Sequence, residues 1–316
     1  MTPGGRAAGL TAASTLAVLA ATTPAAAFKA GIAVANLGSN SVTTYAGNAS
    51  GNANPRSRIR GRKTRLNQPT GIAVNGAGVM AVANYGDNSV TVYKPRINGN
   101  VSPVATIRGA KTRLNRPLGL AFDAASELYV VNGGNNSVTI FAPGTRGNVA
   151  PRRTIAGSRT RLSFPEAIAL FSGRLFVPNG GSDTVTIFDQ RARGNAKPAA
   201  TITGTRTGLN TPDGVTLTRA GNIVITNTGN NSLTFFARHA SGDALPTATV
   251  MGPRTGIDLP GQPAVDAAGT IAVPNYGTDS VTFYKSGANG DAAPSSTISS
   301  RRTRLHGPTA IAVLRR

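Results

Sequence analysis

The amino-acid sequence predicts an all-β protein, a six-bladed β-propeller built from four-stranded antiparallel blades. A ten-residue signature, Asn-x-Gly-x-(Asn/Asp)-(Ser/Thr)-(Val/Leu)-Thr-x-(Tyr/Phe), occurs six times at intervals of 47 or 48 residues. Every unit after the first holds four short runs of strand-like composition, and the one run that the first unit lacks is present near the C-terminus. Four strands in a period of about 40–50 residues are typical of a propeller blade. The signatures begin at Asn36, Asn84, Asn132, Asn179, Asn227 and Asn275.

The second unit shows the four predicted strands most plainly. Residues 69–74, 79–84, 89–93 and 103–109 are rich in Val, Ile, Thr or Tyr, and Gly, Pro, Asn or Asp bounds them. Such runs indicate short antiparallel strands. The repeats lack the i, i+3, i+4 apolar spacing of an amphipathic helix. We therefore expect the units to consist of strands and turns.

The fourth run of every unit opens with proline. Because proline has no N–H to donate to a sheet, it belongs on an edge strand, and the outermost strand of a blade is such an edge. The prolines are Pro55, Pro103, Pro151, Pro198, Pro246 and Pro294.

The two ends of the repeat region complete one blade. The first unit starts at its second strand, residues 31–36, and has no counterpart of the 69–74 strand. That strand occurs instead at residues 308–313. Pairing of these two segments closes the ring, so six signatures predict six blades in one domain, residues 28–316.

Residues 1–27 have the pattern of a secretory signal peptide. Arg6 supplies positive charge, residues 10–21 form a short apolar core, and residues 25–27 give an Ala-x-Ala cleavage site. An unstructured Ala/Thr-rich tail is the alternative. The core is too short and too weakly apolar to span a membrane. We therefore expect a secreted or periplasmic monomer, and the absence of cysteine removes disulfides and thiolate metal sites.

Positive charge recurs in the segments that join one unit to the next. The chain has 33 Lys and Arg against 12 Asp and Glu, a formal net charge of +21. The joining segment reads (Gly/Ser)-x-(Lys/Arg)-Thr-(Arg/Gly)-(Leu/Ile), and in a propeller such segments lie on one face with the signature turns. The repeat predicts a basic ring that could bind anions. Its members are Lys63, Arg65, Lys111, Arg113, Arg159, Arg161, Arg206, Arg254, Arg302 and Arg304, with Gly208 and Gly256 interrupting the second position.

The units also resemble those of known propellers. Residues 69–74, 82–84 and 88–93 are similar to NHL-type repeats, and they share the Val-Ala-Asn-x-Gly-x-Asn-Ser-Val cadence of YVTN-type exported propellers. The similarity covers essentially all of residues 28–316. Proteins of this kind include RNA-binding modules, streptogramin lyases, lactonases and exported bacterial proteins. The resemblance therefore implies the fold and leaves the function open.

The first functional hypothesis is a non-enzymatic binding or scaffold module with an anionic ligand on the basic face. Sequence-selective RNA recognition needs aromatic side chains that stack on bases, whereas aromatics are only 5% of this chain and recur as repeat residues. An acidic surface polysaccharide or another anionic polymer is therefore the expected partner. Two alternatives stay open: a solvated cationic surface without a ligand, and a scaffold that assembles through its outer strands.

The second hypothesis is a metal-dependent, lactonase-like hydrolase at the mouth of the central channel. The lactonases of this resemblance hold a divalent cation there with Glu, Asp and Asn side chains, and oxygen ligands of that type suit Ca²⁺. Glu166 and Asp213 occupy equivalent positions in adjacent blades, and Asn179 or Asn227 could complete a site. The two acids could instead be solvated or paired with nearby arginines. The full set of equivalent positions is Thr70, Leu118, Glu166, Asp213, Gly261 and Thr309.

The remaining repeated and titratable residues favour structural roles. The six leading asparagines are expected to hold the signature turns through side-chain hydrogen bonds. The streptogramin lyases of this resemblance use histidines beside a metal, but this chain has only His239 and His306. We expect these two on opposite faces, which argues against that activity and against a Ser-His-Asp triad. No cofactor other than Ca²⁺ is indicated.

Overall fold

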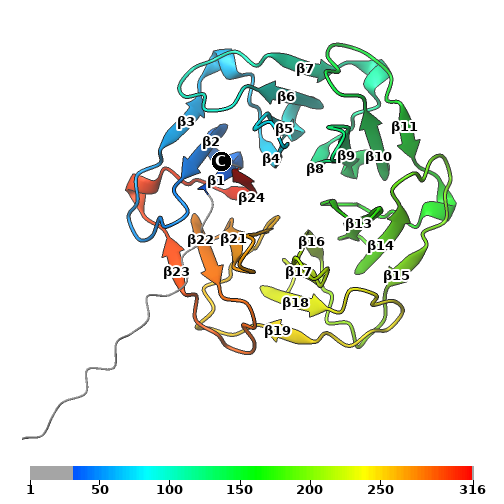
Figure 1. Ribbon diagram of the computed structural model, residues 1–316, viewed down its shortest axis with the longest axis vertical. Coiled ribbons are helices and arrows are strands. Elements are labelled where there is room, and N and C mark those ends of the chain that lie inside the picture. The colour runs from blue at the N-terminus through cyan, green and yellow to red at the C-terminus, as the bar shows by residue number, and fades with distance from the viewer. Residues whose placement is uncertain (1–30, 315–316) are drawn as a thin grey trace, which may run out of the picture.

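The computed structural model describes residues 31–314, which form a ring of six four-stranded antiparallel sheets around a central axis (Figure 1). The predicted six-bladed propeller is therefore confirmed. The predicted signal peptide, residues 1–27, lies outside the described residues. Within residues 31–314, the structure has no helix long and apolar enough to cross a membrane.

Each blade runs from an innermost strand near the axis to an outermost strand at the rim. Blade 1 comprises β24 (Pro308–Leu314), β1 (Gly31–Asn36), β2 (Ser41–Tyr45) and β3 (Ser57–Arg60). Blade 2 comprises β4 (Pro69–Val74), β5 (Met80–Asn84), β6 (Ser89–Tyr93) and β7 (Ala105–Arg108). Blade 3 comprises β8 (Pro117–Phe122), β9 (Leu128–Asn132), β10 (Ser137–Phe141) and β11 (Arg153–Ile155).

The other three blades repeat this order with shorter innermost strands in blades 4 and 6. Blade 4 comprises β12 (Ala169–Phe171), β13 (Arg174–Asn179), β14 (Thr184–Asp189) and β15 (Ala200–Ile202). Blade 5 comprises β16 (Pro212–Leu217), β17 (Ile223–Asn227), β18 (Ser232–Phe236) and β19 (Ala248–Val250). Blade 6 comprises β20 (Ala264–Val265), β21 (Ile271–Asn275), β22 (Ser280–Tyr284) and β23 (Ser296–Ile298).

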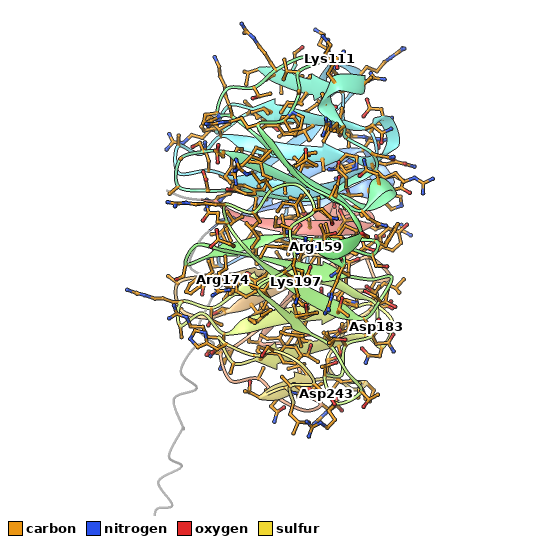
Figure 2. The ribbon with its side chains drawn as sticks, turned by 90° about the vertical axis from the view of Figure 1, so that its right-hand side faces the viewer. Lys111, Arg159, Arg174, Asp183, Lys197 and Asp243 are labelled. Carbon is orange, nitrogen blue, oxygen red and sulfur yellow. The ribbon has the colours of Figure 1, made fainter. Side chains whose placement is uncertain are left out.

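Short 3₁₀ helices occur in two kinds of connection. Those in the signature turns are η1 (Leu37–Ser39), η3 (Tyr85–Asp87) and η5 (Gly133–Asn135). Those in the inter-blade loops are η2 (Arg62–Thr64), η4 (Ala110–Thr112), η6 (Ser158–Thr160) and η7 (Arg301–Thr303). Both kinds of connection lie on one face of the disc, which we call the loop face. Figure 2 views the disc edge-on, with Asp183 in a signature turn and Arg174 at the start of β13 on opposite sides.

The core lies between neighbouring blades, so the two middle strands of each blade are buried on both faces. Strand β5, for example, is buried along its whole length. One apolar cluster joins Val42 and Ile59 of blade 1 to Val82 and Tyr93 of blade 2. The Tyr93 hydroxyl donates a hydrogen bond to the Thr64 carbonyl at 2.6 Å. The aromatic residues that end the signatures therefore pack the blades together, as the sequence predicted.

The leading asparagine of each signature is buried and holds the turn on the loop face. The Asn132 side-chain oxygen accepts from the Asn115 backbone N–H at 3.2 Å. Its amide donates to the Ser137 and Thr139 hydroxyls at 3.3 and 3.1 Å. Equivalent bonds form in the other blades, which confirms the structural role predicted for these residues.

The ring closes at both the inner and the outer strands. Strand β24 pairs antiparallel with β1, with Val34 opposite Ile311. At the rim, a loop glycine of each blade forms a parallel bridge with the outermost strand of the preceding blade, as between Gly99 and Ile59. The predicted prolines lie just before these strands, as Pro103 does before Ala105. Because the rim strands are bridged in this way, they offer less free edge for assembly than the sequence suggested.

Candidate functional site

A β-bulge at the start of each innermost strand, or in the segment leading into it, places one residue of every blade at the mouth of the central channel. In blade 5, Pro212 pairs with Asn227 and Gly214 pairs with Thr226, so Asp213 is an extra, unpaired residue. The same one-residue excess follows the equivalent proline in every other blade, although Pro165 and Pro260 lie before β12 and β20 and pair only through isolated bridges. A bulge re-aims the side chain that it leaves unpaired. The bulge is the physical reason why these equivalent positions face the axis.

These side chains line one cavity of about 300 Å³. The structure brings Glu166 and Asp213 together in it, as their equivalent positions predicted. All six bulge positions contribute, and the rest of the wall comes from the signature turns and from the segment before β20. The lining residues are Leu37, Thr70, Leu118, Glu166, Asp213, Thr228, Leu259, Gly261, Gln262, Tyr276 and Thr309.

Large side chains at the bulge position coincide with small residues just after the leading asparagine. Gly180 lies beside Glu166: a Cβ placed on it would stand 3.2 Å from Oε1 of that carboxyl. A Cβ on Gly133 would stand only 2.6 Å from the Leu118 side chain. In blade 6 the sizes are reversed, with a glycine at the bulge and Tyr276 after the asparagine. The two positions therefore compete for the same space. A large residue at one position paired with a small residue at the other is a pattern in the sequence that points to this contact.

Burial raises the pKa of both cavity carboxyls, and the charge of Asp213 raises the pKa of Glu166 further. Burial disfavours the ionised form of an acid, and two carboxylates in one site repel each other. Both residues keep partial solvent contact through the mouth, so protein atoms surround the carboxyls without sealing them. The pair therefore retains a proton to higher pH than two separate surface acids would.

The asparagines weighed as additional metal ligands do not reach this cavity. Asn179 is fully buried, and its oxygen accepts from the Ser163 N–H at 3.2 Å. Asn227 is equally buried and bonded to the Asn210 N–H. That part of the expectation is wrong, because the turns already use both side chains. Residues 31–314 contain no group of three or more Asp, Glu or His side chains placed to hold a metal ion.

The ten predicted basic-ring residues all lie exposed on the loop face. In the loop before blade 2, Thr64 is buried and its hydroxyl donates to the Gly61 carbonyl at 2.6 Å. Leu66 is buried as well, so Lys63 and Arg65 project outward between these two anchors. The other five loops repeat the buried Thr and the apolar residue two positions later.

Each loop is held by an Asn or Asp from the blade that follows it. The Lys63 N–H donates to Oδ1 of Asn100 at 2.9 Å, and the Arg206 N–H donates to Oδ1 of Asp243 at 2.8 Å. Where the acceptor is Asp, its second oxygen pairs with the arginine side chain. The Arg206–Asp243 and Arg254–Asp291 ion pairs measure 3.2 and 3.1 Å. The acceptors, in loop order from blade 1, are Asn52, Asn100, Asn148, Asn195, Asp243 and Asp291.

The loops before blades 1 to 4 differ from the two others in a second way. Their second cation, such as Arg113 at φ 59°, adopts a left-handed backbone conformation. Gly208 and Gly256 occupy this position before blades 5 and 6, with φ of 68° and 67°. We call the first four loops the arginine sector and the other two the paired sector. Among the described residues, no ion pair involves the ring cations of the arginine sector, which are Lys63, Arg65, Lys111, Arg113, Arg159, Arg161, Arg302 and Arg304.

Further cations reinforce the arginine sector beside blade 1. Burial, together with the charges of Arg60 and Arg304, lowers the pKa of Arg58. Its Nε is buried and has no hydrogen-bond partner. Like charges accumulate here without an acid to neutralise them.

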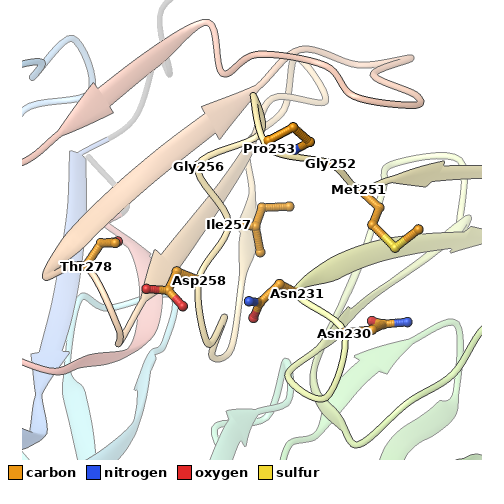
Figure 3. Close-up of a pocket in the computed structure, with 9 residues that line it drawn as sticks. All are labelled: Asn230, Asn231, Met251, Gly252, Pro253, Gly256, Ile257, Asp258 and Thr278. Atoms are coloured by element: carbon orange, nitrogen blue, oxygen red, sulfur yellow. The ribbon is translucent and has the colours of Figure 1, made fainter.

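A second recess on the loop face lies in the paired sector (Figure 3). It has a volume of about 380 Å³ and lies at the junction of blades 5 and 6. Met251 and Ile257 contribute its apolar wall, and Gly256 stands where the arginine sector has arginine. Asn231 also lines it, but its oxygen is engaged by the Leu259 N–H at 2.8 Å.

Neither histidine lines either of the two recesses. His306 is exposed in the loop before β24, on the loop face. His239 is exposed in the loop after β18, which leaves the opposite end of that strand. They lie on opposite faces, as predicted, and cannot share one site.

Comparisons with known proteins show the fold alone. No family model matches this chain, and no curated protein sequence matches it. A protein of unknown function from Bacteroides caccae is 10% identical with a TM-score of 0.66, covering 91% of this chain and 100% of that one. A chain from a nidogen/laminin complex is 12% identical with a TM-score of 0.63, covering 90% and 98%. A catalytically inactive virginiamycin B lyase from Staphylococcus aureus with quinupristin is 10% identical with a TM-score of 0.55, covering 79% and 75%.

Proposed function

We propose that this protein is an exported, non-enzymatic binding module of NHL-type repeats that holds an anionic polymer, such as an acidic polysaccharide, on its arginine sector. The observation that carries the proposal is the contrast between the two sectors. Four neighbouring loops each present two exposed cations without an acid partner, while the other two present one cation each, paired with Asp.

The backbone conformation of the second cation supports a role for its side chain. A non-glycine residue in the left-handed region costs about 1 kcal/mol relative to its favoured conformations. Glycine fills the equivalent position at Gly208 and Gly256 with nearly the same φ. Arginine at Arg65, Arg113 and their equivalents therefore carries a backbone cost that the fold itself does not require.

Charge of this kind favours polymers over small ions. Each phosphate or sulfate that meets a cation releases counterions, so the affinity falls as salt rises. Eight cations spread over four loops match a ligand that is extended and repeatedly charged. Few aromatic side chains accompany them, which argues against sequence-selective RNA recognition.

The experiment is a binding titration of labelled heparin and labelled single-stranded DNA over a range of salt concentrations. A variant with Lys63, Arg65, Lys111 and Arg113 all changed to Gln should bind at least about tenfold more weakly and with a shallower salt dependence. Its unfolding free energy should change by less than about 1 kcal/mol, because all four side chains are exposed.

The matched control removes four exposed cations from the opposite face. Lys94, Arg174, Arg191 and Lys285 lie at or just beyond the strand ends away from the loop face. Changing them to Gln lowers the net charge equally and should leave most of the affinity. Equal losses in the two variants would mean that only net charge matters, and the proposal would be rejected.

The cavity supports a second candidate, the metal-dependent hydrolase. Glu166 and Asp213 share the cavity, as such a site requires. However, Ca²⁺ takes six to eight oxygen ligands, and the two candidate asparagines are already used by the turns. The test is the melting temperature with Ca²⁺, which should rise in the native protein and not in Glu166→Gln. No Ca²⁺-dependent rise and no turnover of lactones or esters would remove this candidate.

A further inference from the structure

The central cavity is acidic at the centre of a basic face. None of its eleven lining residues is Lys, Arg or His, although the chain has 33 Lys and Arg. No hydrogen bond or ion pair to the side chains of Glu166 and Asp213 is found within residues 31–314. The two carboxyls are therefore free to meet a ligand that the protein does not itself provide.

The hydroxyl groups of the cavity add further acceptors. Thr70 donates its proton to the Pro117 carbonyl at 2.9 Å, and Thr309 donates to the Pro69 carbonyl at 3.1 Å. Toward a ligand these two oxygens can only accept. Oγ1 of Thr228, which also lines the cavity, is buried and has no hydrogen-bond partner. An orphaned buried hydroxyl is costly unless another group completes its bonds.

The rest of the wall is apolar. Leu37, Leu118, Leu259 and Tyr276 surround the polar groups, and Leu259 and Tyr276 remain 42% and 45% exposed. A hydrated metal ion would gain no favourable contact from these apolar side chains. A cation carried on an apolar body would cover them, and the Tyr276 ring could also meet its charge through a cation–π contact.

We infer that this cavity binds an organic ammonium ion, a protonated amine on an apolar or aromatic body. Its three N–H donors match the two carboxyls and the accepting hydroxyls, and its body matches the leucines and the tyrosine. A volume of about 300 Å³ is at the lower end of the range for small-molecule sites. A bound cation would also offset the repulsion between Glu166 and Asp213. The inference is independent of the polymer proposed for the arginine sector.

The test is calorimetric titration of the purified protein with three probes of similar shape: 2-phenylethylammonium, 2-phenylethanol and 3-phenylpropionate. The ammonium should bind, the neutral alcohol should bind at least about tenfold more weakly, and the carboxylate should not bind. Glu166→Gln and Asp213→Asn should each weaken ammonium binding at least about tenfold, since each removes a carboxyl that the bound cation would stabilise in its ionised form.

Asp87→Asn is the matched control, because Asp87 lies on the loop face outside the cavity. It should leave ammonium affinity unchanged. The inference is overturned if the ammonium does not bind, if it binds equally to the cavity variants, or if Ca²⁺ alone binds and the ammonium cannot compete with it. A loss of heparin binding in the four-residue loop variant would not affect any of these outcomes.

Discussion

The arginine sector and the paired sector share one scaffold and differ in a few atoms. In both, an oxygen from the following blade accepts the backbone N–H of the first cation, at 2.9 Å for Lys63 and 2.8 Å for Arg254. In the arginine sector that oxygen belongs to Asn, and in the paired sector it belongs to Asp. The other polar atom of the Asn side chain is an uncharged amide nitrogen. The other oxygen of the Asp side chain is charged and pairs with the arginine side chain.

This difference shows that the hydrogen bond needed for folding and the charge of the loop surface are set independently. Asn and Asp satisfy the same backbone bond, so the fold tolerates either residue. Their choice nevertheless decides whether the neighbouring cation is neutralised. Variation among otherwise regular repeats is therefore the place to look for function, because the shared residues are already accounted for by the blade.

The largest expected effect concerns the scaffold that both sectors share. Asn132→Ala in the arginine sector and Asn227→Ala in the paired sector should each destabilise the fold by about 3 kcal/mol or more, since each leaves several buried groups without partners. Urea denaturation measures this, and the exposed Asn222→Ala is the control. A large loss in only one sector would contradict a common scaffold.

The next effect concerns the cavity acids, which contrast with the partly exposed, arginine-paired aspartates of the paired sector. Burial raises the pKa of Glu166 and Asp213 in the folded state. Stability should therefore be fully present below their unfolded values, near pH 4, and should fall as the pH rises through neutrality. Thermal melts from pH 4 to 9 measure this fall.

Glu166→Gln should flatten that pH dependence, because it removes one titrating group and the repulsion on the other. Asp243→Asn should not, since Asp243 lies partly exposed on the surface, paired with Arg206. If the melting temperatures of both variants change with pH as in the native protein, the cavity acids do not control this pH dependence.

Exchanging the accepting residues should convert one sector into the other. Asp243→Asn with Asp291→Asn frees Arg206 and Arg254 and should raise heparin affinity, while Asn100→Asp with Asn148→Asp should lower it. We expect changes on the order of threefold to tenfold, since each exchange alters two contacts. Salt titrations measure the change, and the retained Oδ1 acceptor keeps the loops in place. Unchanged heparin affinity in both double variants would show that the basic-ring cations do not contribute to binding.

The smallest expected effect is on backbone strain. Arg113→Gly should raise the unfolding free energy by about 1 kcal/mol or less, because glycine adopts a positive φ without the steric cost. Gly256→Arg should lower it by a similar amount. Urea midpoints measure both, and a stabilising Gly256→Arg would show that arginine is not strained at this position.

Much of the fold was predictable because each unit is local. The strand runs, the signature turns and the missing first strand at 308–313 follow from short-range composition and from the repeat interval. Glu166 and Asp213 were also placed together correctly, because equivalent positions in a ring face a common axis. The turn-holding role expected for Asn179 and Asn227 was predicted correctly, and the alternative that one of them completes a metal site was wrong, because both side chains are already bonded in the turns.

The sequence by itself determined the number of blades, their strand order and the face on which the cations lie, because a regular repeat can bury its apolar strands only against its neighbours. The tertiary structure decided which cations are neutralised and what the channel mouth contains. Arg206 meets Asp243 across 37 residues, and the cavity wall draws on all six blades. Such contacts depend on how neighbouring blades pack, so no local pattern in the chain specifies them.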